Sequence, residues 1–254
     1  MVPLSVAIIA RDEADRLPGA LAAVADLAAE VVVLDSGSTD QTVAVAEAAG
    51  ARVLRTDWPG HVAQKNRALL ACRHDWVLSI DADERPDAAL RASIRAALQA
   101  EPAVAGFELS RRSWWQGAPI RHGTWYPDRR LRLVRRDRAR WVGLDPHDRL
   151  EVDGALGRLE GELEHHPYRD LGEHLAVIDR YTAIAARALA EAGVRARWWD
   201  VALRPPLHIV KSLLLKAGFR DGVRGLCLAW LGAAYVALKW GRRWLEQDAG
   251  PGAT

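Results

Sequence analysis

Short apolar runs alternate with amphipathic stretches along the first part of the chain. Four of these runs have the length of interior strands: residues 4–10, 31–34, 52–54 and 76–80. Helical spacing and capping residues predict helices between and after them: a helix starting near Leu17, one running from the turn at 36–40 to Gly50, and helices over 64–72 and 86–99. Strands that alternate with helices predict a mostly parallel sheet with helices on both faces.

Charged side chains follow three of the predicted strands. They are Arg11 and Glu13, Asp35 and Asp40, and Asp81 and Asp83. In open parallel sheets, ligands bind outside the carboxyl ends of the strands, so we expect these groups to meet at one edge. Asp81 and Asp83 suit a divalent cation that also binds substrate phosphates. The alternative is a polar turn before a helix, where acids are favoured anyway.

The start of the sheet excludes two common nucleotide sites. Neither the glycine-rich dinucleotide fingerprint nor the phosphate-binding P-loop follows the first strand. A bound nucleotide would therefore have its base and ribose held by acids such as Asp35. A metal ion and basic side chains would hold its diphosphate.

Residues 106–152 combine predicted strands at 107–109 and 131–134 with loops rich in Arg and Trp. Such loops suit a phosphate- or sugar-bearing ligand, single-stranded nucleic acid, or a solvated rim. With a net charge of only +2, the chain does not look like a general nucleic-acid binder. His147 and Asp148, in a predicted loop, can supply a general base or form a structural pair. We interpret His165 and His166 as part of a structural turn.

The C-terminal part is helical and carries basic and aromatic residues. A helix is predicted from Leu171 to Ala192, and residues 205–245 alternate aliphatic clusters with Lys, Arg, Trp and Tyr. This pattern is typical of helices that lie in a membrane interface and face anionic lipid. Packing on the domain or on a second subunit is the alternative. The longest uncharged run, Gly225–Leu238, is shorter than a bilayer span.

Composition indicates how many domains the chain forms and in which compartment it resides. The 254 residues, half of them hydrophobic, suit one large domain or a domain with an appendage. The two cysteines lie far apart without a metal-binding pattern, which indicates a reducing compartment. The N-terminus lacks the features of a signal peptide, so we expect a cytoplasmic protein. Four Lys against 31 Arg indicate the codon bias of a GC-rich bacterial genome.

Taken in order, these motifs resemble a known enzyme family. The chain resembles the inverting family 2 glycosyltransferases with the GT-A fold, and in particular the bacterial lipopolysaccharide core branch that includes heptose-directed β-1,4-glucosyltransferases. The resemblance covers roughly residues 4–245. The matching segments are 4–13, 32–40, 64–66, 76–84, 132–134, 147–148, 181–182 and 218–222.

The resemblance implies a domain plan and roles for individual residues. Residues 1–165 would form the catalytic domain, with a nucleotide-binding half at 1–105 and an acceptor-side half at 106–165. Residues 166–254 would form helices that associate with the membrane. The implied nucleotide-sugar contacts are Arg11, Glu13, Asp35, Lys65 and Asp81. Asp81 and Asp83 would hold Mg²⁺ or Mn²⁺, and Asp148, beside His147, would be the catalytic base where many relatives have Glu.

The implied activity is metal-dependent, inverting transfer of a hexose. The donor would be a nucleotide sugar, most simply a UDP-sugar, and the acceptor a lipopolysaccharide core or a similar envelope glycolipid. The enzyme would be peripheral on the inner face of the bacterial inner membrane, without a nucleic-acid partner. One alternative is a sugar-phosphate nucleotidyltransferase, which should carry a glycine-rich loop after its first strand. The other is a non-catalytic membrane-bound scaffold, against which the acids at three strand ends argue.

Overall fold

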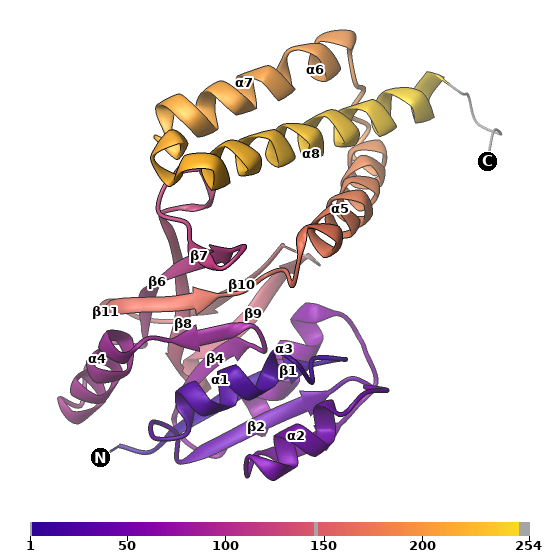
Figure 1. The fold of residues 1–254 in the computed structure, drawn as a ribbon. Helices are drawn as coiled ribbons and strands as arrows, with labels where there is room; N and C mark the ends of the chain where they lie inside the picture. Colours follow the sequence, from indigo (N-terminus) through magenta and orange to yellow (C-terminus); the bar gives the residue numbers. More distant parts are fainter. Residues whose placement is uncertain (1, 145–146, 249–254) are drawn as a thin grey trace. The chain divides into compact units, whose positions relative to one another are not determined.

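The computed structural model describes residues 2–144 and 147–248. The chain forms two compact units (Figure 1). The first, here called the sheet unit, contains the chain up to Arg111 and then Asp128–His165. The second, the helical unit, contains Arg112–Pro127 and the chain from His166 onward. The assignment of nucleotide-binding and acceptor-side roles to parts of the sheet unit stays a prediction.

The sheet unit is built on a mixed sheet with the strand order β3-β2-β1-β4-β8-β6-β11-β5. Strands β1 to β4 are parallel neighbours: β1 is Leu4–Ala10, β2 Glu30–Asp35, β3 Arg52–Arg55 and β4 Trp76–Asp81. The later strands are β5 Glu84–Pro86, β6 Gly106–Trp115, β8 Asp128–Arg135 and β11 Leu156–His165. Strand β8 runs antiparallel to both β4 and β6, so the parallel part ends at β4.

Alternating side chains bury the parallel strands on both faces. In β4, Trp76, Leu78 and Ile80 belong to one hydrophobic cluster, and Val77 belongs to the other. Helices complete both clusters: α1 (Leu17–Val24), α2 (Thr42–Ala48) and α4 (Ala88–Gln99) on one side, and α3 (His61–Ala71) on the other. A separate ladder of β9 (Ala139–Leu144) and β10 (His147–Val152) contributes to the second cluster.

Strand register aligns the acidic strand ends. Ala10 pairs with Asp35 across β1 and β2, and Ile9 pairs with Asp81 across β1 and β4. The carboxyl ends of β2 and β4 therefore reach the same edge of the sheet, as the sequence predicted.

One predicted helix start was wrong. Pro86 ends β5, where it pairs with Leu163 of β11, instead of opening the following helix. Because β5 is the edge strand, a residue without an N–H group is tolerated there. The helix α4 begins after Asp87, whose carboxylate accepts a hydrogen bond from the Leu90 N–H at 2.7 Å.

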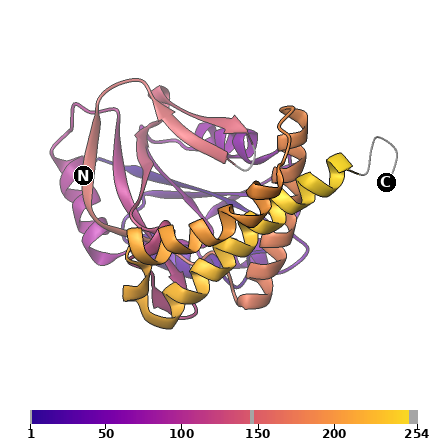
Figure 2. The ribbon, with the colours of Figure 1, turned by 90° about the horizontal axis from the view of Figure 1, so that it is seen from above.

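The helical unit combines a short hairpin with a set of helices. Strand β7 (Ala118–Pro119) pairs with the end of β6, followed by a 3₁₀ turn, η1 (Gly123–Trp125). The helices are α5 Leu171–Glu191, α6 Trp198–Ala202, α7 Arg204–Val210 with its π-helical extension η3 Lys211–Leu215, a 3₁₀ turn η4 Gly218–Asp221, and α8 Gly222–Asp248. Figure 2 shows α7 and α8 lying side by side.

Two glycines allow the close packing of α8. A Cβ at Gly225 would lie 1.9 Å from the carbonyl oxygen of Gly218, and one at Gly232 would lie 2.3 Å from Nε2 of His208. Gly225 lies against the turn between η3 and α8, and Gly232 lies where α8 packs against α7. Larger residues at either position would force these segments apart.

A buried histidine links the hairpin to α5. His174 is 4% exposed, accepts a hydrogen bond at Nδ1 from Nε1 of Trp115 at 3.2 Å, and stacks on Tyr168 with ring centroids 3.9 Å apart. Burial lowers the pKa of His174 to about 4. The folded protein therefore holds the His174 ring in its neutral form at pH 7.

We predict that this histidine makes the fold sensitive to mild acid. The unfolded imidazole has a pKa near 6.5, so between pH 6.5 and about 4 the unfolded state binds a proton that the folded state does not. The stability contributed by the neutral ring is complete above pH 6.5 and is lost as the pH falls. The unfolding free energy of the wild type should fall by about 2 kcal/mol relative to His174→Gln between pH 7 and pH 5. Urea titrations at both pH values measure this difference, and parallel pH profiles would contradict it.

Candidate active site

Two loops at the edge of the sheet interlock. The Asp12 carboxylate accepts a hydrogen bond from the Thr39 N–H at 2.7 Å, and Asp40 accepts one from the Ala14 N–H at 3.1 Å. Asp12 also has a φ of 54°, in the left-handed region that Asp and Asn tolerate best among residues with side chains. Asp12 therefore holds the loop after β1 against the loop after β2.

Asp35 holds the turn beyond β2 and lines a polar cavity. Its carboxylate is 2% exposed and accepts hydrogen bonds from the N–H groups of Gly37 and Ser38 and from the Ser38 hydroxyl. The cavity has a volume of about 440 Å³. It is lined by Asp35, Gly37, Ser38, Asp40, Val43, Arg55, Thr56 and Asp57. The cavity lies beyond β2 and β3, and the predicted contact of Asp35 with a nucleotide stays a prediction.

Arg11 and Glu13 lie at the same edge but not in this cavity. The Arg11 side chain is 60% exposed, with its closest acidic partner Asp12 at 4.0 Å. The Glu13 carboxylate lies 3.6 Å from the Arg16 guanidinium, and the Glu13 N–H donates to the Thr42 hydroxyl at 2.8 Å. Their predicted contacts with a nucleotide sugar stay predictions.

A cluster of charged side chains surrounds the end of β4. Lys65 Nζ lies 2.8 Å from an oxygen of Asp148 and 3.1 Å from Oδ1 of Asp81. The other Asp81 oxygen lies 3.1 Å from Arg132. Lys65, on α3, thus joins the acid at the end of β4 to the predicted base, which lies in β10 and not in a loop.

Glu84 is the most deeply buried acid of this cluster. It is fully buried, and Oε1 lies 3.0 Å from Arg132 of β8 and 3.2 Å from Arg111 of β6. Its other oxygen accepts a hydrogen bond from the Asp81 N–H at 3.0 Å. We call Lys65, Asp81, Glu84, Arg111, Arg132 and Asp148 the charged cluster.

The cations decide the charge of the buried acids. Burial raises the pKa of Asp81, but Lys65 and Arg132 outweigh it and lower the pKa overall. Burial likewise opposes ionisation of Glu84, and Arg132 and Arg111 bring its pKa below the usual value. The ring of Trp141 lies 4.4 Å from Lys65 Nζ and 5.2 Å from the Arg132 guanidinium. This indole stabilises both cations through its π face and limits their access to water.

Asp83 differs from its neighbours because acids outnumber cations around it. Burial, followed by the charges of Asp81 and Glu84, raises the pKa of Asp83 well above its usual range. Nε2 of His165 lies 3.5 Å from its carboxylate. A divalent cation at this position would offset the repulsion among the acids, so the residues fit a metal ion.

The protein side chains do not form a complete metal cage. Within residues 2–144 and 147–248, no group of three or more His, Cys, Asp or Glu side chains is arranged to hold a metal ion. Mg²⁺ commonly takes one or two carboxylates, with water and substrate phosphates supplying the other ligands. The arrangement around Asp83 therefore suits a metal ion that binds together with a diphosphate.

The structure adds residues that the sequence analysis did not assign. Glu84, Arg111 and Arg132 complete the charged cluster. Glu84 and Arg132 lie in segments that carry the family resemblance, but that resemblance gave them no individual role. His165 ends β11 opposite Glu84, so its interpretation as part of a turn was wrong. The alternation of Leu159, Gly161 and Leu163 with three glutamates was a signal for this strand.

Strand β10 begins at His147, whose side chain is outside the described part of the structure, as are residues 145 and 146. The predicted catalytic role of His147 stays a prediction.

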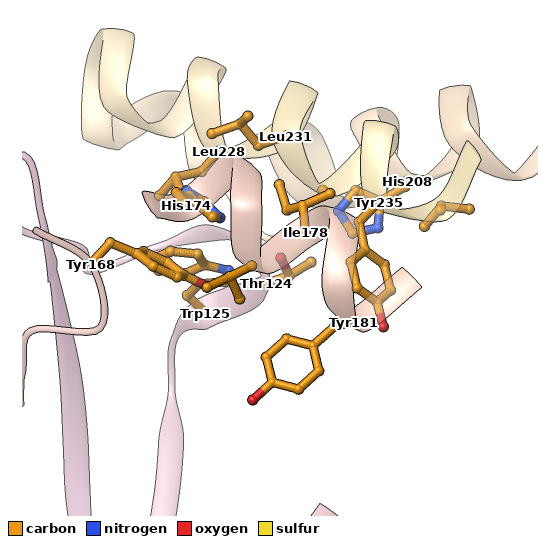
Figure 3. Close-up of a pocket in the computed structure, with 13 residues that line it drawn as sticks. Thr124, Trp125, Tyr168, His174, Ile178, Tyr181, His208, Leu228, Leu231 and Tyr235 are labelled. Carbon is orange, nitrogen blue, oxygen red and sulfur yellow. The ribbon is translucent and has the colours of Figure 1, made fainter. Parts of the chain in front are cut away.

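The helical unit has a cavity of a different kind (Figure 3). Its volume is about 240 Å³, and its lining includes Trp125, Tyr168, Ile178, Tyr181 and Tyr235. No Asp, Glu, Lys or Arg is among the described residues that line it. Its lining also includes His174 and His208. Without Lys or Arg it does not suit a diphosphate, so the candidate diphosphate chemistry lies in the sheet unit.

The family of the chain follows from comparison with known proteins. The family model described as glycosyl transferase family 2 matches residues 5–151, which include Asp35, Lys65, Asp81 and Asp148. The chain belongs to glycosyltransferase family 2. The sheet unit has the GT-A fold of these transferases, and membership of the family sets aside the nucleotidyltransferase alternative.

Relatives extend the match beyond the sheet unit. The lipopolysaccharide core biosynthesis glycosyltransferase LpsC of Rhizobium meliloti is 31% identical over 93% of this chain and 90% of its own length. An uncharacterized glycosyltransferase of Rickettsia bellii is 48% identical, over 32% of this chain and 28% of its own. The first similarity runs through both units of this glycosyltransferase.

Solved structures show weaker likenesses. Glucosyl-3-phosphoglycerate synthase from Mycobacterium tuberculosis, in complex with Mn²⁺, UDP-glucose and phosphoglyceric acid, gives a TM-score of 0.39 at 28% identity and covers 43% of this chain and 44% of its own. A mycobacterial protein gives a TM-score of 0.49 at 21% identity, over 76% of this chain and 75% of its own. Both TM-scores lie below 0.5, so the assignment rests on the family match.

We predict that Arg132 is needed to keep the buried acids in place. Arg132→Met removes one of two cations from both Glu84 and Asp81, and leaves Arg111 and Lys65 as their remaining partners. The loss should therefore approach but not exceed the cost of breaking a buried ion pair, about 3–5 kcal/mol. The control is Arg130→Met on the same strand, where the guanidinium is 44% exposed and pairs with Asp128. It should cost less than about 1 kcal/mol. Chemical denaturation of both variants tests the difference, and similar losses would show that Arg132 has no special role.

Proposed function

We propose that this glycosyltransferase moves a sugar from a UDP-sugar to a hydroxyl of a lipopolysaccharide core or similar glycolipid, with inversion at the anomeric carbon. The observation that carries the proposal is the position of Lys65, whose ammonium group lies within 3.1 Å of both Asp81 and Asp148. It links the acid of the Asp-x-Asp motif to the predicted base. The name of the relative LpsC supports the class of acceptor.

The donor would bind along the edge of the sheet. Its base would enter the cavity beside Asp35, and its ribose would lie toward Asp81. Arg11 and Glu13, on the loop after β1, would reach the donor from the same edge. Lys65 would contribute positive charge close to the diphosphate. These contacts would fix the orientation of the anomeric carbon relative to the acceptor.

Mg²⁺ or Mn²⁺ would be held chiefly by Asp83. Both oxygens of Asp81 already contact cationic side chains, whereas the raised pKa of Asp83 reflects an excess of negative charge around it. His165, with Nε2 3.5 Å from this carboxylate, is placed to contribute a second ligand. When bound, the ion would neutralise charge that develops on the departing diphosphate.

Asp148 would be the general base. One of its oxygens lies 2.8 Å from Lys65 Nζ, which would hold the carboxylate beside the acid at the end of β4. The acceptor oxygen would form a bond to the anomeric carbon while the bond from that carbon to the diphosphate oxygen breaks. The proton of the acceptor hydroxyl would pass to Asp148, and the bonding electrons would leave with the nucleoside diphosphate. His147 would assist from the adjacent position.

The site of action would be the inner face of the bacterial inner membrane. A glycolipid acceptor is held in a membrane, and the helical unit would bring the enzyme to that surface. The reaction requires no nucleic-acid partner. A non-catalytic scaffold of the same fold would release no nucleoside diphosphate, and this distinguishes the two.

We predict that Asp83 and Asp148 can be separated by their effects on binding. Both Asp83→Ala and Asp148→Asn should reduce transfer, the latter by about 10²- to 10⁴-fold because a general base is removed. Only Asp83→Ala should abolish the gain in UDP affinity on adding Mn²⁺, as measured by calorimetry. The control is Asp26→Asn, which changes a carboxylate that is 60% exposed and pairs with Arg95. Unchanged Mn²⁺-dependent affinity in Asp83→Ala would contradict the metal assignment.

We also predict that the donor can be identified because its binding stabilises the folded protein. A ligand at 100 times its dissociation constant that binds only the native state stabilises it by about 2.7 kcal/mol. Among a panel of sugar nucleotides with Mn²⁺, a UDP-sugar should therefore raise the melting temperature most. No shift with any member would contradict nucleotide-sugar binding.

A further inference from the structure

Exposed apolar side chains gather in the helical unit. Among the described residues, three exposed large hydrophobic side chains belong to the sheet unit and eighteen to the helical unit. The most exposed are Leu215 at 77% and Val223 at 76%, at the turn that joins α7 to α8. Proteins that remain monomeric in water rarely expose so much apolar surface together, so this surface calls for a partner.

The apolar residues form a stripe on each arm of the α7–α8 hairpin. Leu203, Leu207, Val210 and Leu214 are spaced by four, three and four residues and are all exposed. Phe219, Val223, Leu226 and Trp230 repeat the same spacing and are also exposed. In the α-helical parts, such spacing places Leu207 and Val210 on one face of α7, and Val223, Leu226 and Trp230 on one face of α8. Leu203, Leu214 and Phe219 lie just outside these two helices. We call Leu214, Leu215, Phe219 and Val223, where the two stripes meet, the hairpin tip.

The charge around the hairpin identifies the partner. Residues 201–245 contain eight Lys and Arg but a single acid, Asp221. The Asp221 carboxylate accepts hydrogen bonds from the N–H groups of Arg121 and His122, so its charge is directed inward. Lys211, Lys216 and Arg220 flank the tip. An anionic lipid surface complements this charge, whereas a second copy of the chain would bring like charges together.

Helix α8 has the length of a membrane span, and 22% of its most apolar window is buried within the unit. The segment Gly218–Asp248 is long and apolar enough to cross a bilayer by length and composition. However, Leu228, Ala229 and Ala233 are buried within the unit, and the Arg204 guanidinium lies 4.4 Å from the ring of buried Trp240. Crossing the bilayer would break this packing against α5 and α7.

We propose that the α7–α8 hairpin lies in the interface of an anionic membrane, with its tip inserted among the lipid tails and α8 not spanning the bilayer. The inference rests on the proposed function in that a glycolipid acceptor makes such a surface necessary. The basic residues would contact lipid headgroups, and the two stripes would contact the hydrocarbon.

Vesicle flotation with matched variants tests this surface. The wild type should float with vesicles of phosphatidylcholine and phosphatidylglycerol, bind much less to phosphatidylcholine alone, and be released by high salt. Leu214→Ser, Leu215→Ser and Phe219→Ser together should lower partitioning by about a hundredfold or more. The matched control replaces Trp58, Leu70 and Leu156, the three exposed large apolar residues of the sheet unit, by Ser. It should leave partitioning unchanged.

Two further sets of substitutions test how much the basic residues beside the tip contribute to membrane binding. Lys211→Gln, Lys216→Gln and Arg220→Gln should each lower binding to the anionic vesicles by about fivefold. The control changes Arg73, Arg140 and Arg158 to Gln, since these side chains of the sheet unit are 72%, 76% and 72% exposed. Equal losses in both sets would indicate nonspecific attraction and would overturn the proposal.

The depth of insertion distinguishes the remaining outcomes. An environment-sensitive fluorophore on Leu215→Cys, in a Cys227→Ser background, should shift to the blue with anionic vesicles, and one on Leu70→Cys should not. Alkaline carbonate should extract the bound protein. Resistance to carbonate would instead indicate a spanning α8, and a shift that follows protein concentration without lipid would indicate self-association. Either outcome overturns the proposal. Mn²⁺-dependent UDP binding by the tip variants, measured without vesicles, tests the proposed function separately.

Discussion

The burial of Glu84 beside Asp81 is the constraint on which the sheet unit depends. A buried carboxylate without a partner is strongly unfavourable, so cations must come from other parts of the chain. Arg132 arrives on β8, Arg111 on β6 and Lys65 on α3. The antiparallel strands are therefore joined to the parallel part both by backbone hydrogen bonds and by charge. A change that shifted β8 by one residue would move Arg132 to the other face of the sheet.

The same constraint separates the roles of the two acids of the Asp-x-Asp motif. Asp81 lies between two cations and stays ionised without help. Asp83 adds a third negative group at a position where fewer cationic side chains lie close by. The excess charge raises the pKa of Asp83. The same excess is what the proposed divalent cation would offset.

The sequence predicted the parallel strands well because each is decided by its own side chains. The predicted bounds of β1 match the structure, and those of β4 differ by one residue, since runs buried on both faces leave little choice of conformation. The strands β5, β9, β10 and β11 depend on their partners. In β11 the alternation was present but its apolar positions include a glycine, and β5 is only three residues long, so His165 and Pro86 were misplaced. The resemblance assigned Lys65, Asp81 and Asp148 to the site, and the structure shows that they are in contact. Arg111 and Arg132 join them only through the strand order β4-β8-β6, which no local pattern reveals.

The path of the chain through the two units bears on how such enzymes can diversify. Strand β6 belongs to the sheet unit as far as Arg111 and to the helical unit from Arg112 onward. The helical unit therefore takes its Trp115 and Ile120 from the middle of the gene and Leu228, which packs with them, from its end. Recombination at residue 165 would transfer only one of these parts and leave the other without its apolar partners. Exchange of the helical unit alone between relatives thus requires crossovers at three places, after residues 111, 127 and 165, and its evolution is tied to that of the strands between them.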